Sequence, residues 1–143
     1  MKSALLLVPA IVILSACQQP KEASASHAWV RLAAVPSNPS AAYFTLTGGP
    51  KDATLTGVST TAAVRSEMHE SMNAGGMMSM TSLKLVALRA GGEVKFAPGG
   101  KHVMLYGLKA VPGGAVPLTF TFADGHTLTT PAKVVGAGDP APE

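Results

Sequence analysis

The sequence predicts an all-β sandwich, because apolar residues alternate with polar ones in short segments that glycine and proline interrupt. The 143 residues include 15 glycines and 11 prolines, and no long stretch repeats the apolar spacing of a helix. Leucine and phenylalanine alternate with threonine over 118–122, a related alternation covers 43–47, and Asp124-Gly125 is a hairpin turn signal. We therefore expect one sandwich domain over residues 28–136, a length that supplies one hydrophobic core.

The first segment, residues 1–16, has the pattern of a lipoprotein signal peptide. Lys2 precedes an apolar run over 4–14 that is too short to span a bilayer as a helix. The run ends in Leu-Ser-Ala-Cys, which resembles the bacterial lipobox, where the signal is cut before a cysteine that is then acylated. The alternative is that Cys17, the single cysteine, is a small buried apolar residue. We expect a lipid anchor at Cys17 and, because Gln18 and not aspartate follows, attachment to the outer membrane facing the periplasm.

The segments that flank the domain are small and polar. Residues 17–27 are expected to form a flexible tether between the lipid and the domain. His27, at the end of this tether, is interpreted as a solvated residue rather than an auxiliary metal ligand. Residues 137–143 are expected to be a disordered tail.

Chemically distinctive residues gather between His69 and Met104. Two imidazoles and two thioethers lie there, on His69, Met80, His102 and Met104. One such side chain on a strand would more often be ordinary packing or surface, so the prediction depends on their joint spacing. All six methionines after Met1 lie in the region from residue 68 to 104, whereas gap-filling core methionines would be scattered. Sulfur ligands select Cu(I), and these four side chains predict a site for one Cu(I) per chain.

The first His–Met pair is expected on a β-hairpin. Asn and Gly tolerate the positive φ of tight turns, so a four-residue loop is predicted at 73–76. This loop pairs Met72 with Met77 and places His69 directly opposite Met80.

Three further methionines of this hairpin are candidate auxiliary metal contacts: Met72, Met77 and Met78. They would give an arriving or departing ion transient ligands, and the alternative is that they are apolar cover over the site. We expect Met78 to share with Ser71 the face opposite His69.

The second pair, His102 and Met104, lies two residues apart in an apolar run, so both side chains share one face of an expected strand. A turn is expected at 98–100 before this strand. We expect this pair to be ordered without metal, and the whole hairpin to be the mobile half of the site. That the two halves meet does not follow from the sequence.

The four positions match the signature of the PCuAC family of periplasmic copper chaperones: His, ten residues, Met, twenty-one residues, His, one residue, Met. The chain resembles this family from about Trp29 to Val134, and the flanking residues agree over 28–31, 41–46, 98–108 and 116–125. The resemblance implies a cupredoxin-like Greek-key β-sandwich that binds Cu(I), and we expect the protein to be a monomer. It also implies delivery of copper to the copper-centre subunit of cytochrome c oxidase, with a thiol-redox copper protein as a further candidate partner.

Composition argues against several other functions. The 11 Lys and Arg residues face 8 Asp and Glu without any basic run, so nucleic acid is not an expected partner. No nucleophile triad, carboxylate pair or phosphate loop is recognisable, and four protein ligands leave no open metal position, so an enzyme is not expected. Blue-copper electron carriers need a Cys thiolate, which the domain lacks. Two alternatives stay open: a copper-sequestering or resistance lipoprotein without a dedicated acceptor, and a copper-independent envelope adhesion module.

Replacing the cysteine tests the predicted anchor. Cys17→Ser should move the protein from the membrane fraction to the soluble fraction, because the acylated thiol is lost, and copper binding should not change. Fractionation with a carbonate wash measures the first effect. A variant that stayed with the membranes after the wash would contradict the lipobox interpretation.

Overall fold

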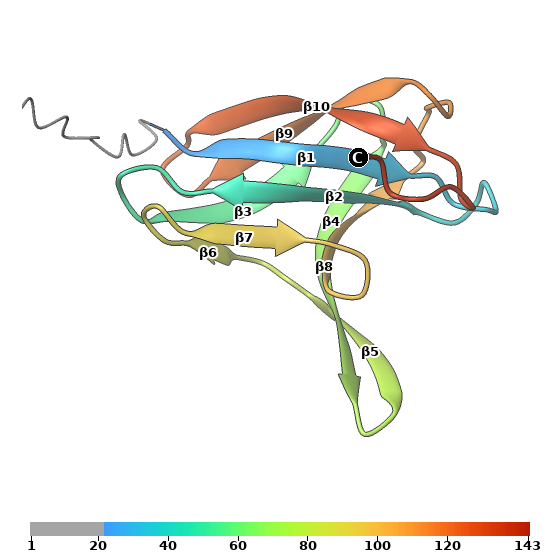
Figure 1. Cartoon of the computed structure of the whole chain (residues 1–143), viewed down its shortest axis with the longest axis horizontal. Coiled ribbons are helices and arrows are strands. Elements are labelled where there is room, and N and C mark those ends of the chain that lie inside the picture. Colours follow the sequence, from blue (N-terminus) through green and yellow to red (C-terminus); the bar gives the residue numbers. More distant parts are fainter. Residues whose placement is uncertain (1–21) are drawn as a thin grey trace, which may run out of the picture.

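The computed structural model of the chain describes residues 22–143, which form ten β-strands (Figure 1). The strands are β1 (Ser24–Arg31), β2 (Ser40–Thr47), β3 (Ala53–Ser59), β4 (Arg65–Ala74), β5 (Met77–Ser82), β6 (Val86–Leu88), β7 (Glu93–Phe96), β8 (Lys101–Tyr106), β9 (Ala115–Phe122) and β10 (Thr127–Val135). Within this range, no helix could cross a membrane. The predicted signal peptide and Cys17 lie outside the described residues.

The strands form one hydrogen-bonded sheet in the order β5-β4-β8-β2-β1-β10-β9-β3-β6. β1 and β10 are parallel, and the other neighbouring pairs are antiparallel. β2 has two partners along one edge, because residues 40–42 pair with β8 whereas residues 44–47 pair with β7. β8 therefore diverges from β7, and β4 and β5 follow β8 on that side of the molecule (Figure 1).

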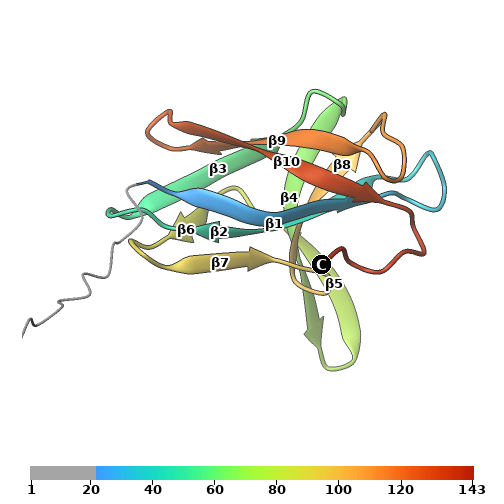
Figure 2. The same ribbon diagram turned by 45° about the horizontal axis from the view of Figure 1, so that its top comes forward.

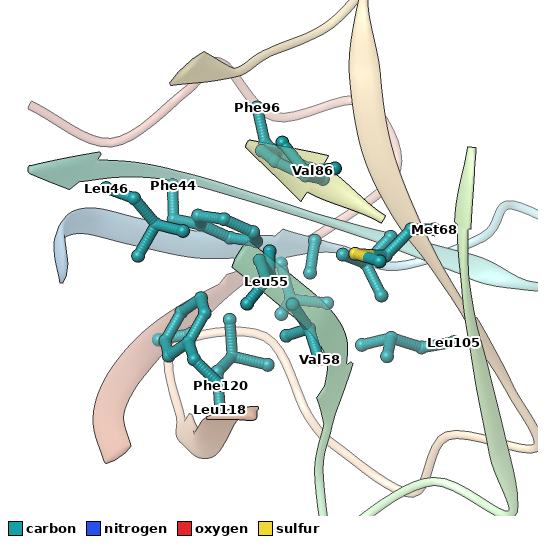
Figure 3. Packing of buried hydrophobic residues seen from close by; sticks show 14 of the residues in the cluster. Phe44, Leu46, Leu55, Val58, Met68, Val86, Phe96, Leu105, Leu118 and Phe120 are labelled. Atoms are coloured by element: carbon teal, nitrogen blue, oxygen red, sulfur yellow. The ribbon is translucent and has the colours of Figure 1, made fainter. Parts of the chain in front are cut away.

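The sheet curls over a hydrophobic core (Figure 3). The ring of Phe44 on β2 stacks on Phe96 of β7, with 4.3 Å between centroids, and meets Phe120 of β9 edge-on at 4.7 Å. β1 and β10 separate β2 from β9 in the sheet, so this contact requires the two halves of the sheet to face each other. Leu118 and Phe120 are fully buried, as their alternation with threonine predicted. The expected all-β sandwich is confirmed.

A smaller apolar cluster covers the outer side of β1 and β2. Trp29 and Tyr43 lie 4.6 Å apart between ring centroids and pack with Val135. Ala41 packs against this cluster and pairs across to Met104 on β8. The outer face of the sheet is thus apolar up to the strand that carries the second predicted His–Met pair.

The hairpin of β4 and β5 extends away from the sandwich in both views of the molecule (Figures 1 and 2). β5 forms one edge of the sheet, and each of its six residues is exposed. The hairpin therefore contributes little to the core beyond Met68, which lies near the base of β4 and is buried (Figure 3).

The domain begins earlier than the sequence indicated. The tether expected over 17–27 is wrong at its end, because β1 begins at Ser24 and pairs with β2 from there. Ala25 packs against the core, so a short alternation of small residues was sufficient for strand pairing. His27 interrupts the register with a φ of 50° at a bulge, and it is a strand residue rather than a linker residue.

The expected disorder over 137–143 is also wrong at the start of that segment. After β10, the backbone N–H of Gly136 donates to Oδ2 of Asp139 at 2.7 Å. The Arg31 guanidinium donates to the carbonyl oxygen of Asp139 at 3.3 Å. These hydrogen bonds fold the first residues of the tail back onto β1.

Candidate metal centre

β4 lies between β8 and β5, and this position brings the two predicted halves of the site together. His69 on β4 pairs directly with His102 on β8. Their ring centroids are 6.0 Å apart and the ring planes are inclined by 29°. Opposed residues of antiparallel strands share a face, so the two imidazoles are neighbours on the outer face of the sheet.

A backbone carbonyl fixes the orientation of His102. Its ring is buried, and Nδ1 lies 2.9 Å from the carbonyl oxygen of Gly100. A carbonyl oxygen only accepts hydrogen bonds, so Nδ1 carries the proton and Nε2 keeps its lone pair. The same oxygen accepts the N–H of Ser71 at 3.0 Å, which ties β4 to the start of β8.

The turn that presents this carbonyl is the one expected at 98–100. The N–H of Gly100 donates to the carbonyl of Ala97 at 3.0 Å, and Gly99 has a φ of 83°. Pro98 before a positive-φ glycine is the pattern of a type II turn, in which proline supplies the fixed first φ. The predicted turn is confirmed.

His69 is oriented by a side chain. Its Nε2 lies 3.1 Å from Oε2 of Glu67, and the ring is mostly buried, with 16% of the side chain exposed. An ionised carboxylate only accepts, so Nε2 donates the proton. In the neutral ring Nδ1 is then the nitrogen with the free lone pair, and it is buried without a hydrogen-bond partner.

Glu67 is held in turn by two residues on the same face. It forms an ion pair with Arg65 and accepts a long hydrogen bond of 3.5 Å from the hydroxyl of Tyr106. The Arg65 guanidinium lies 3.9 Å above the Tyr106 ring. The hydrogen bond from His69 lowers the pKa of the Glu67 carboxyl, and the charge of Arg65 acts in the same direction.

The hairpin has a different register from the predicted one. The loop is Gly75-Gly76 alone, with φ values of 61° and 80°, which is the two-residue turn favoured in hairpins. His69 therefore pairs with Ser82, and Met80 pairs with Ser71. The expected direct pairing of His69 with Met80 is wrong by two residues. A shift of two preserves the face, so Met80 still lies on the side of His69, as its diagonal neighbour.

The four predicted ligands therefore project from one face of three adjacent strands. Met104 is half-buried on β8, two residues from His102, and it pairs with Glu67 on one side. Met80 is 54% exposed on the edge strand. The structure brings His69, His102 and Met104 together on paired strands and leaves Met80 at the open side.

The three auxiliary candidates divide between the two faces of the hairpin. Met78 pairs with Asn73 and so lies on the face of His69, because residues two apart on a strand point the same way. The expected position of Met78 on the opposite face is therefore wrong. The same holds for Ser71, which lies two residues from His69 on β4 and shares its face. Met72 and Met77 lie on the reverse face, away from the imidazoles.

Sequence reasoning missed Glu67 and Gly100. The signal for Glu67 was its spacing, because a carboxylate two residues before a histidine lies beside it on a strand. Gly100 acts through its carbonyl oxygen, which no residue pattern distinguishes.

Residues 22–143 hold no grouping of three or more His, Cys, Asp and Glu side chains suited to a metal ion. The thioethers of Met80 and Met104 are further donors on this face, and thioether sulfur suits a soft ion.

The pairing also changes which part of the site should move. We expect amide exchange in the metal-free protein to be slow in β8 and in residues 65–70 of β4, because these two segments pair along their whole length and β8 also pairs with β2 over residues 103–105. Their opening free energies should lie near the global value. The tip at Gly75 and the edge strand β5 should open at a cost of ~0 to a few kcal/mol. Hydrogen exchange followed by NMR checks this, and equal protection in β4 and β5 would contradict it.

Comparisons with known proteins agree with this architecture. The solution structure of the Cu(I) form of DR1885 from Deinococcus radiodurans is 28% identical, with a TM-score of 0.64 over 85% of this chain and 83% of that chain. The copper-bound PCuAC domain from PmoF2 is 22% identical, with a TM-score of 0.65 over 83% of this chain and 96% of that one. The chain therefore has the fold of PCuAC domains, and the expected cupredoxin-like β-sandwich is confirmed.

Sequence comparison identifies the family. The curated relative "Putative lipoprotein Lxx21020" of Leifsonia xyli subsp. xyli (strain CTCB07) is 34% identical over 114 residues, which cover 76% of this chain and 68% of the relative. The family model "Putative lipoprotein LpqE-like" matches residues 24–134. The chain belongs to the LpqE-like family.

Proposed function

We propose that this protein binds one Cu(I) through His69, Met80, His102 and Met104 and delivers it to the copper-centre subunit of cytochrome c oxidase. The observation that carries the proposal is the direct pairing of His69 with His102 on the face that also holds both methionines. A related solved structure, that of DR1885, is a Cu(I) form, which supports the choice of ion.

The donor set fits this ion. Two imidazoles and two thioethers are neutral, and thioether sulfur is a soft ligand that suits Cu(I). The ring centroids are 6.0 Å apart, a separation compatible with one ion between the rings when each nitrogen–metal bond is about 2 Å. In the neutral form that metal binding requires, each ring donates through one nitrogen, to Glu67 or to the Gly100 carbonyl, and keeps the other nitrogen for the ion.

The exposure of the ligands fits a carrier that must release its cargo. His102 is buried and Met104 is half-buried, whereas Met80 is exposed on a strand that has a neighbour on one side only. An acceptor can approach from the side of Met80 and replace that sulfur first. Met78, exposed on the same face, is a candidate for transient contact with the departing ion.

The location is part of the proposal. The family description and the relative's name both refer to lipoproteins, which supports acylation of Cys17. We place the domain in the periplasm, tethered to the outer membrane. An oxidising compartment also suits a copper site of methionines, because thioethers do not form disulfides.

A pair of matched substitutions tests the role of the exposed methionine. Met80→Leu should release Cu(I) to a chelator about tenfold faster, because a sulfur ligand is replaced by an apolar side chain of similar size. A tenfold faster release corresponds to an activation free energy that is lower by about 1.4 kcal/mol. Met77→Leu is the control, since Met77 is also exposed on β5 but faces away from His69. Stopped-flow transfer kinetics measure both. Identical release rates for the two variants would exclude Met80 as a ligand.

The ion and the acceptor need separate measurements. X-ray absorption of the loaded protein should show both nitrogen and sulfur scatterers, and a shell without sulfur would refute the site.

A deletion strain should lose oxidase activity at limiting copper and regain it with excess copper or with the wild-type gene, but not with His102→Ala, which removes a nitrogen ligand. Full oxidase activity without the protein, together with sensitivity to toxic copper, would instead indicate the sequestering lipoprotein.

A further inference from the structure

We infer that Glu67 is a positioning residue for the copper site, whose carboxylate fixes the proton of His69 on Nε2 so that Nδ1 binds the ion. This inference rests on the proposed function, since it specifies which atom of a proposed ligand meets Cu(I). It also makes the two imidazoles inequivalent, because His102 would bind through Nε2.

The first argument is the state of the His69 ring. Only two buried side-chain nitrogen or oxygen atoms in residues 22–143 lack a hydrogen-bond partner, and Nδ1 of His69 is one of them. The other, Nε of Arg31, belongs to a guanidinium that already donates to Asp139. A buried polar atom without a partner costs free energy, so such atoms are rare and call for an explanation. A metal ion at Nδ1 would supply the missing partner.

The second argument is that the other nitrogen of His69 is already occupied. Nε2 lies 3.1 Å from Oε2 of Glu67, within the range of an N–H···O hydrogen bond, and the acceptor is a carboxylate. A carboxylate that accepts from one ring nitrogen sets the tautomer and increases the basicity of the other nitrogen as a metal ligand. In His102 the nitrogen that would not bind the ion is also held by an acceptor, in this case the neutral carbonyl of Gly100.

The third argument is that the carboxylate is itself fixed. Glu67 pairs across the ladder with Met104, so the pairing of β4 with β8 fixes its backbone position. Arg65 forms an ion pair with Glu67, and the hydroxyl of Tyr106 points to the same oxygen that accepts from His69. A freely rotating carboxylate could not hold an imidazole in one orientation, whereas this one is held from two sides.

The test compares three substitutions on one strand. Glu67→Ala removes the acceptor. Glu67→Gln keeps an acceptor oxygen but loses the charge. Glu70→Ala is the matched control, because Glu70 is also on β4 and also pairs with a cation, Lys101 at 3.0 Å, but lies on the other face of the strand.

Nitrogen–proton correlation spectra of the metal-free proteins, recorded at alkaline pH, report the tautomer of each imidazole directly. We expect His69 to carry its proton on Nε2 in the wild type, Glu67→Gln and Glu70→Ala, and to become a mixture of tautomers in Glu67→Ala. His102 should keep its proton on Nδ1 in all four proteins. Cu(I) titration in competition with a chelator should give an affinity about 10- to 100-fold lower for Glu67→Ala, with a smaller loss for Glu67→Gln and none for Glu70→Ala.

Two results would overturn the inference: a wild-type His69 with its proton on Nδ1, or a Glu67→Ala variant with unchanged tautomer and unchanged affinity. With either result, the proposed function would still stand if the wild type binds Cu(I) with sulfur ligands. Conversely, a wild type with the expected tautomers that does not bind Cu(I) would refute the proposed function while the role of Glu67 as an acceptor for His69 stood.

Discussion

The pairing of β4 with β8 is the constraint on which the candidate site depends. It places His69 opposite His102, and the Gly100 carbonyl strengthens it by accepting both the Ser71 N–H and the His102 ring proton. Without this pairing the two His–Met pairs would be separate local features with more than twenty residues between them. One backbone oxygen at a type II turn thus links the register of two strands to the tautomer of a candidate ligand.

The same pairing separates the chemistry from the stability of the fold. Because side chains alternate along a strand, Met68 and Val103 point into the core, where both are buried. Their neighbours in sequence, His69 and His102, point to the outer face of the sheet. The core over which the sheet curls contains no predicted ligand. We therefore expect β4 and β8 to be ordered without a metal ion, in contrast to small domains whose folding depends on a bound metal. The site is a modification of one surface of a sandwich that is complete without it.

Local patterns predicted much of this structure. The alternation around Phe120, the turn at Pro98 and the shared face of His102 and Met104 depend on residues close together in sequence, and all three appear as expected. The hairpin register was wrong, because Asn73-Ala74-Gly75-Gly76 is compatible with a loop of two or four residues and only pairing decides between them. The meeting of β4 and β8 is a long-range contact that no local pattern specifies.

The four proposed ligands differ in how firmly the fold holds them, from buried positions on inner strands to an exposed position on an edge strand. His102 and His69 lie on strands with neighbours on both sides and are each oriented by a hydrogen bond from the ring. Met104 is half-buried and lies between its two pairing partners, Ala41 on β2 and Glu67 on β4. Met80 is exposed on an edge strand. Preorganised nitrogens lower the entropic cost of binding, whereas a flexible thioether contributes less to affinity and detaches more easily. For the proposed carrier, such a gradient would give the ion one direction of exit, since the ligand that is easiest to replace is the one that an acceptor can reach.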